Sequence, residues 1–283
     1  MVVAALGVCA ALACPTVAAA QEPIVQTFTT AQNVLPSTDG TLNQGVYSQA
    51  ALFFRDEYET GISGHEQWNS FFSFDVANAC EAADLRLRLA RGEDHKNNHL
   101  QMWEVTTPAG VVNNPGGTPF DFDVFLANLR SVFADLGDGT TFGDVHYSDD
   151  GPATQLLDFP LNAAGAAAFN AARGGFFTIG GTGGGLQPEP FAPTRIFIAV
   201  DDPAALVVTC ARPTTLQQCR NGGWRRFGFG YQGHCTAFVR NQARLACTFE
   251  KVAHGTPAFR AKYGIGPEHE RAMWSCVHTR IGF

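Results

Sequence analysis

The sequence lacks the local motifs that mark several common secreted hydrolases and metal proteins. It has no Gly-x-Ser-x-Gly nucleophile elbow and no His-Glu-x-x-His pair, which one class of esterases and one class of metalloproteases require. It also has no Cys-x₂-Cys pair, the close spacing typical of a structural zinc site. A glycosidase is still open, because it needs only two suitably placed carboxylates among the 26 acidic residues.

Charged side chains are absent from the first twenty residues, MVVAALGVCAALACPTVAAA. An apolar segment that ends in small residues predicts a secretory signal peptide over 1–20, although the usual basic start is missing. A lipoprotein signal is the alternative because Cys14 follows Ala13, but Ala11 stands where a lipobox has Leu. No later stretch reaches the roughly 20 apolar residues of a membrane span. We therefore expect a secreted or cell-surface protein.

Six cysteines follow the expected signal peptide: Cys80, Cys210, Cys219, Cys235, Cys247 and Cys276. An even number in an oxidising compartment predicts disulfides, although six cysteines allow 15 pairings. Five of the six follow residue 209. This clustering indicates a small C-terminal module that covalent links hold together.

Charge divides the chain at the same place. Residues 211–283 contain eleven Lys or Arg and three acids, a balance of +8, whereas residues 1–210 contain eight and 23, a balance of −15. We therefore predict an acidic domain over 21–209 and a basic, cysteine-rich helical module over 211–283. Such a module suits docking on the acidic domain or binding an anionic polymer.

The acidic domain has the pattern of an antiparallel β-sandwich. Apolar and polar residues alternate over 72–76, 85–89 and 196–200, which gives each strand one face for a core. Further strands are expected at 51–54, 100–106, 156–159, 176–179 and 206–209. Eight or so short strands separated by turn-rich runs indicate a mainly β, jelly-roll-like sandwich.

Helices are expected at two insertions in this sandwich and throughout the C-terminal module. The insertions cover 124–135 and 163–173, and the second begins after the N-cap Asn162 and ends at Gly174. In the module, helices are expected at 235–254, from Pro257, and at 268–280.

The stretch 219–235 admits three interpretations. A Cys235 nucleophile beside His234 is disfavoured, because sequence neighbours point apart and an exported thiol oxidises. Zinc is disfavoured by the spacing. A Cys219–Cys235 disulfide would close a loop of about 15 residues and stabilise the fold by roughly 3 kcal/mol, with Trp224 and Phe227 as an aromatic anchor. Cys247–Cys276 would join two helices, and Cys80–Cys210 is then the remaining pair.

Segments of both domains resemble known secreted proteins. The runs 68–76, 83–89 and 133–181 resemble a β-sandwich domain of secreted bacterial proteins without a known activity. The patterns Cys-x-Asn-Gly-Gly-Trp-x-x-Phe-Gly…Gln-Gly-x-Cys (219–235) and Ala-Phe-Arg-Ala-Lys-Tyr-Gly (258–264) between Cys247 and Cys276 resemble C-terminal modules of exported actinobacterial proteins. The resemblance implies export and architecture, and it implies no reaction.

Two groups of aromatic and basic residues are candidates for binding. The module offers Trp224, Arg225, Arg226, Phe227 and Tyr231, which suit an anionic cell-envelope polymer in a salt-dependent manner. Nucleic acid has the same electrostatics, but export argues against it. The sandwich domain offers rings that could stack on sugars or equally pack in a core: Tyr47, Tyr58, Trp68, Trp103 and Tyr147.

Metal ligands are suggested by two groups, neither with a specific spacing. Calcium could be bound by carboxylates that lack the order of an EF-hand loop: Asp121, Asp123, Asp135, Asp138, Asp144, Asp149 and Asp150. A second set of ligands could bind another ion if its segment were helical: Glu93, Asp94, His95 and His99. The polar residues 96–98 between the two histidines favour a solvated loop instead. No other cofactor is expected.

These patterns together favour an exported, non-enzymatic binding or structural protein that recognises carbohydrate or a cell-envelope polymer. The alternative is a secreted hydrolase that cleaves polysaccharide with a carboxylate pair. A cleft with two facing carboxylates would indicate the hydrolase, whereas exposed aromatics without such a pair would indicate the binding protein.

Overall fold

The structure is a computed structural model that describes residues 22–30, 43–48, 52–53, 61–63, 66–90, 99–147, 152, 155–183, 194–195, 203–264 and 269–282. Internal contacts divide them into two compact units, a sandwich unit of residues 24–239 and a helical unit of residues 240–281. Within this described part, no helix combines the length and apolar character needed to cross a membrane.

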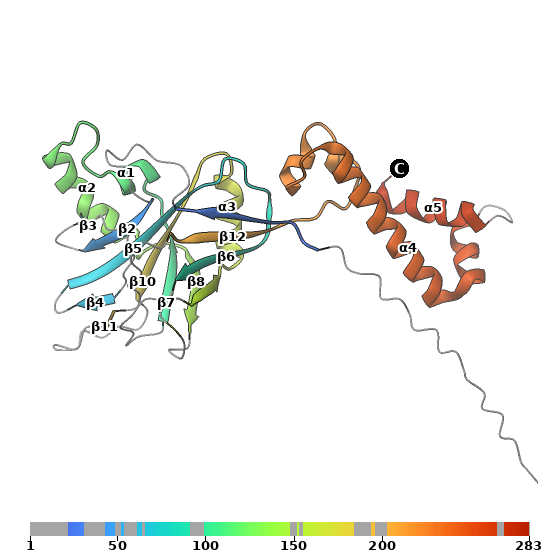
Figure 1. Cartoon of the computed structure of the whole chain (residues 1–283), viewed down its shortest axis with the longest axis horizontal. Coiled ribbons are helices and arrows are strands. Elements are labelled where there is room, and N and C mark those ends of the chain that lie inside the picture. The colour runs from blue at the N-terminus through green and yellow to red at the C-terminus, as the bar shows by residue number, and fades with distance from the viewer. Residues whose placement is uncertain are drawn as a thin grey trace, which may run out of the picture. The chain divides into compact units, whose positions relative to one another are not determined.

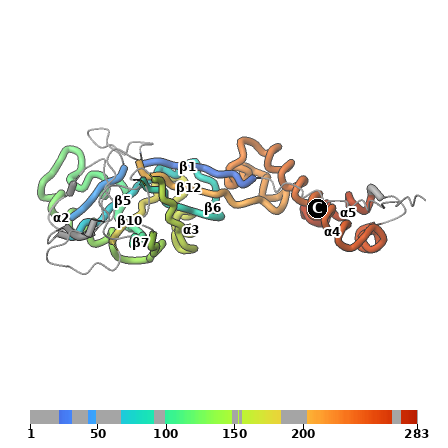
Figure 2. The backbone as a smooth tube through the Cα atoms, turned by 60° about the horizontal axis from the view of Figure 1, so that its bottom comes forward, coloured from blue at the N-terminus to red at the C-terminus, as the bar shows by residue number. Residues whose placement is uncertain are grey.

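Two antiparallel sheets form the sandwich unit (Figure 1). The first has the order β1 (Val25–Thr29), β12 (Ala205–Cys210), β6 (Ala82–Ala90) and β9 (Leu156–Pro160). The second has the order β11 (Thr194–Arg195), β4 (Gly61–Ser63), β5 (Glu66–Asp75), β10 (Phe176–Gly183), β7 (His99–Glu104) and β8 (Thr141–His146). In addition, β2 (Gln44–Ser48) pairs with β5 and with β3 (Leu52–Phe53). Figure 2 shows β1, β12 and β6 side by side.

One hydrophobic core joins the two sheets. The alternating leucines of β6, Leu85, Leu87 and Leu89, are at most 1% exposed, and they share a cluster with Phe72 and Phe74 of β5. Alternate residues of a strand face the same side of its sheet, so the period-2 pattern supplies this core. The expected mainly β, antiparallel sandwich is confirmed, and its jelly-roll strand order stays a prediction.

Most of the expected strands are present, as β3, β5, β6, β7, β9, β10 and β12. The strand expected over 196–200 lies outside the described residues. Three longer strands were missed: β1, β2 and β8. All five residues of β2 are buried, polar ones included, so its sequence shows no alternation of polarity.

Helices cover the second sheet and close one part of the core. The expected insertions are α2 (Phe122–Asp135) and α3 (Ala163–Ala172), and a short α1 (Ala109–Asn113) precedes them. The Asn162 carboxamide oxygen accepts from the backbone N–H groups of Ala164 and Gly165 at 2.9 and 3.0 Å, as expected of an N-cap. A second core beneath α1 and α2 contains Tyr47, Phe71, Val112, Leu129, Val132 and Leu136.

The C-terminal helices follow the expected boundaries closely. The segment α4 (Gln232–Tyr263) is broken at Gly255, whose φ of 78° is left-handed, and Pro257 follows in the second part. The last helix is α5 (His269–Ile281). In the helical unit, Cys247, Phe259, Ala272 and Cys276 form a small core, each at most 1% exposed.

Three disulfides are present, and their pairing is the expected one: Cys80–Cys210, Cys219–Cys235 and Cys247–Cys276. The first joins the end of the β5–β6 connection to the end of β12. The second staples a loop that contains the two short 3₁₀ helices η1 (Gln217–Cys219) and η2 (Gly223–Phe227). The third fastens α4 to α5.

Candidate functional site

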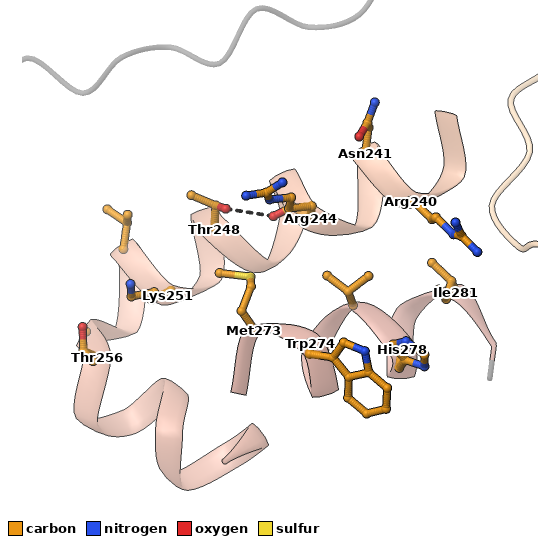
Figure 3. Close-up of a pocket in the computed structure, with 13 residues that line it drawn as sticks. Arg240, Asn241, Arg244, Thr248, Lys251, Thr256, Met273, Trp274, His278 and Ile281 are labelled. Carbon is orange, nitrogen blue, oxygen red and sulfur yellow. Dashed lines mark hydrogen bonds between the residues drawn. The ribbon is translucent and has the colours of Figure 1, made fainter. Parts of the chain in front are cut away.

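A groove of about 980 Å³ lies in the helical unit, between α4 and α5 (Figure 3). On α4, Arg240, Arg244 and Thr248 line it from successive turns of one helix face, and Lys251 follows one turn later. The side chains of Arg240 and Arg244 are exposed. We call this surface the basic groove.

The α5 wall of the basic groove is aromatic and apolar. Trp274 is 63% exposed, and its ring stacks on His278 with 3.7 Å between centroids and 27° between planes. The two side chains project from α5 side by side (Figure 3). A large ring this exposed contributes little to the core, so it is available to a ligand.

Among the described residues that line the basic groove, none is a carboxylate. The nearby Glu250 is engaged, because it accepts hydrogen bonds from Lys262 Nζ at 2.6 Å and from Arg280 Nη2 at 2.7 Å. These bonds lower the pKa of Glu250 to about 2, with Lys262 the largest cause. Neither Arg240 nor Arg244 forms an ion pair with a described residue. The lysine and arginines are therefore the charged groups among the described lining residues.

The described side chains of the basic groove are groups that recognise anions and sugar rings. Guanidinium and ammonium groups recognise carboxylate, sulfate or phosphate, and a flat indole packs against a sugar ring. A glycosidase needs two carboxylates on either side of the bond it cleaves, and the part of this lining that the structure describes supplies none.

The five candidates near the Cys219–Cys235 loop do not form one site. Phe227 is 3% exposed and serves as a core anchor. The Arg225 guanidinium lies 4.8 Å from the centroid of the Trp224 ring, whereas Arg226 pairs with Glu81. Tyr231 is exposed and its ring contacts His234 at 3.8 Å between centroids. Of the five, Arg225 and Arg226 line one cavity together.

That cavity, about 540 Å³ within the sandwich unit, has a third arginine in its lining, Arg173. The Nε and Nη1 atoms of Arg173 are buried and have no hydrogen-bond partner among the described residues. The three guanidinium groups around this cavity make it a second place for an anion. No local sequence pattern points to Arg173, because about fifty residues separate it from Arg225. We call this site the arginine cavity.

The aromatic residues proposed for the sandwich domain are mostly structural. Tyr47 is fully buried, its hydroxyl donates to the Val112 carbonyl at 2.5 Å, and burial raises its pKa. Trp103 Nε1 donates to Thr182 Oγ1 at 2.8 Å, and Tyr147 packs edge-on against Phe159. Trp68 is partly buried on β5. Tyr58 lies outside the described residues.

The described carboxylates considered for calcium have separate local roles. Asp121 caps α2 by accepting from the N–H of Asp123 at 2.9 Å. Asp135 accepts from Thr106 Oγ1 and from the N–H of Thr107, and Asp138 accepts from the N–H of Gly139. Asp149 and Asp150 lie outside the described residues, as do Glu93, Asp94 and His95.

One group of metal-ligating side chains does come together in the described part of the chain: His99, Asp144 and His146. His99 and Asp144 each belong to one of the two sets proposed from the sequence, and His146 to neither. Their ligand atoms all lie within 4.8 Å of one another. Because β7 and β8 bring them together, the contact depends on strand register, which no local spacing reveals.

Comparison with known proteins provides no assignment for these sites. No protein-family model matches the chain, and no curated protein matches it in sequence.

Proposed function

We propose that the protein is an exported, non-enzymatic binding protein whose helical unit binds an anionic polysaccharide of the cell envelope. One observation carries the proposal: Arg240, Arg244 and Lys251 line the same groove as the exposed Trp274, and no described residue of that lining is a carboxylate. The three cations suit a polymer's acidic groups, and the indole suits a sugar ring.

The length of the groove suits a repeating ligand. Arg240, Arg244 and Lys251 extend over three turns of α4, and each turn of a helix rises 5.4 Å. Acidic groups at intervals along a polymer can therefore meet more than one cation at once. Because the arginines are exposed, the attraction is screened by salt beyond about 10 Å at 0.1 M. Binding should weaken as salt is added.

Export is supported by independent features. Three disulfides are compatible with an extracellular protein, since thiols in the cytosol are kept reduced. The apolar first twenty residues and the resemblance of 219–235 to modules of exported proteins point to the same compartment.

Co-sedimentation of the disulfide-bonded protein with insoluble cell-wall material tests the proposal. Two preparations are compared, one with its anionic polymers and one from which they have been extracted, each at low and high salt. The variant R240A/R244A should bind at least tenfold more weakly, because each charged contact contributes more than about 1 kcal/mol. The control R130A/R260A removes two exposed arginines outside the groove and the same net charge.

Specific outcomes would reject the groove as the binding site. Equal losses in R240A/R244A and R130A/R260A would mean that only net charge matters. A loss in R225A but not in R240A/R244A would assign binding to the arginine cavity instead. Release of new reducing ends from the polysaccharide by the purified protein would favour the alternative function, a secreted hydrolase.

A further inference from the structure

The strands β7 and β8 place four polar side chains on one face of the second sheet. In the antiparallel register, His99 lies opposite His146 and Gln101 opposite Asp144. The intervening Leu100 is fully buried in the core. Successive side chains of a strand alternate between faces, so the four polar residues share the face that points away from this core.

The arrangement orients the carboxylate of Asp144 toward the two imidazoles. Gln101 Nε2 donates to Asp144 Oδ2 at 3.1 Å, while His99 Nε2 contacts the other oxygen, Oδ1. The rings of His99 and His146 stack with 4.0 Å between centroids and 17° between planes. The hydrogen bond from Gln101, and to a smaller extent the histidines, lower the pKa of Asp144.

We infer that His99, Asp144 and His146 bind one divalent transition-metal ion, of which Zn²⁺ is the representative. Two imidazole nitrogens and one carboxylate oxygen form a ligand set that such ions accept. Their ligand atoms lie within 4.8 Å of one another, so small side-chain rotations can place each about 2.0–2.2 Å from a common ion. Gln101 then acts as an outer partner that fixes the carboxylate.

The same set does not suit calcium. Ca²⁺ takes six to eight oxygen ligands, whereas this cluster offers one carboxylate beside two nitrogens. With Zn²⁺, three protein ligands leave at least one coordination position for water or for a bound molecule. The side chain of Asp144 is 49% exposed and that of His99 is 14% exposed, so this position faces solvent.

A metal-free explanation competes with this inference. A cross-strand ion pair between His99 and Asp144, with His146 stacked beside it, would satisfy the same three side chains. The two explanations differ in what a metal ion does to the protein, and a direct binding measurement separates them.

The test is calorimetric titration of Zn²⁺ into tag-free, disulfide-bonded protein. The wild type should bind one ion at this site. D144N and H146A each lose a direct ligand and should bind Zn²⁺ at least tenfold more weakly, because loss of a residue that only orients a ligand already weakens metal binding about tenfold. Q101A should weaken binding by about tenfold. The control H254A removes an exposed histidine of the helical unit and should bind as the wild type does.

Substitution with Co²⁺ provides a readout of coordination. The wild type should develop visible absorption bands that are absent from D144N, and melting in the presence of a chelator should show that all variants remain folded. The inference is overturned if the wild type shows no saturable binding, or if D144N and H146A bind Zn²⁺ as tightly as the wild type.

Discussion

Glu250 and Arg280 lie 30 residues apart and connect α4 to α5 through a 2.7 Å hydrogen bond between Oε2 and Nη2. Lys262 donates to the other oxygen of the same carboxylate at 2.6 Å, and the Tyr263 hydroxyl donates to Oε2 at 3.0 Å. One acid thus joins the two parts of α4 and the last helix of a basic unit.

This arrangement predicts a pH dependence of the helical unit's stability. The pKa of Glu250 is lowered from 4.5 to about 2, so the folded state favours the ionised acid. Its stabilisation is complete above about pH 4.5 and is lost as the pH falls toward 2. We expect wild-type thermal unfolding temperatures to fall across this range more steeply than those of E250Q. Parallel curves for the two proteins would contradict the prediction.

The Cys247–Cys276 disulfide should be needed for the helical unit to stay folded. It closes a segment of 29 residues, for which the chain-entropy estimate is about 3.5 kcal/mol. The small core of this unit cannot easily replace that contribution. We expect the helical unit of C247S/C276S to unfold at a lower denaturant concentration than that of the wild type. Hydrogen exchange of α4 and α5 at increasing denaturant concentration measures this midpoint. Unchanged protection of both helices would show that the disulfide is dispensable.

Gly180 should not tolerate a side chain. It lies on β10 in the second sheet, and an added Cβ would lie 2.3 Å from the backbone carbonyl oxygen of Leu136, the residue after α2. Backbone cannot move as a flexible side chain can, so G180A should destabilise the sandwich unit by at least 1–3 kcal/mol. G110A is the matched control, because nothing lies within 4 Å of its added Cβ. Urea unfolding measures both.

Trp274 should matter for binding and little for stability. Its ring is 63% exposed and lines the basic groove, whereas Phe249 is 55% exposed and does not line it. We expect W274A to reduce polysaccharide binding by about tenfold or less, since an exposed aromatic contact contributes roughly 1 kcal/mol. F249A should bind as the wild type does, and both variants should melt within a few degrees of it. Equal binding by W274A and the wild type would show that the indole does not contribute to polysaccharide binding.

Features that depend on local pattern were predictable from the sequence. Alternation at Leu85, Leu87 and Leu89 identified β6, and Asn162 identified the start of α3. The pairing of six cysteines followed from the loop lengths and the expected helices. Strand alternation and helix capping depend on residues that are close in sequence, and each disulfide is a single covalent bond between two cysteines.

Features that depend on tertiary contacts were not predictable. The basic groove requires Arg244 and Trp274, 30 residues apart, on facing walls. The binding candidates predicted from the sequence in this module lie near Trp224 instead. The cluster of His99, Asp144 and His146 requires the register of β7 and β8. A shift of one residue would turn the side chains of one strand to the other face, so no spacing in the sequence could reveal it.

The Cys80–Cys210 disulfide has a consequence for how the protein responds to a protease. It encloses 130 residues of chain, from β6 to β12. A protease that cuts once anywhere between the two cysteines therefore produces two fragments that stay covalently joined. The fragment with the helical unit cannot diffuse away from the fragment that contains β1 to β5, and a nicked molecule keeps both units in one particle until the disulfide is reduced.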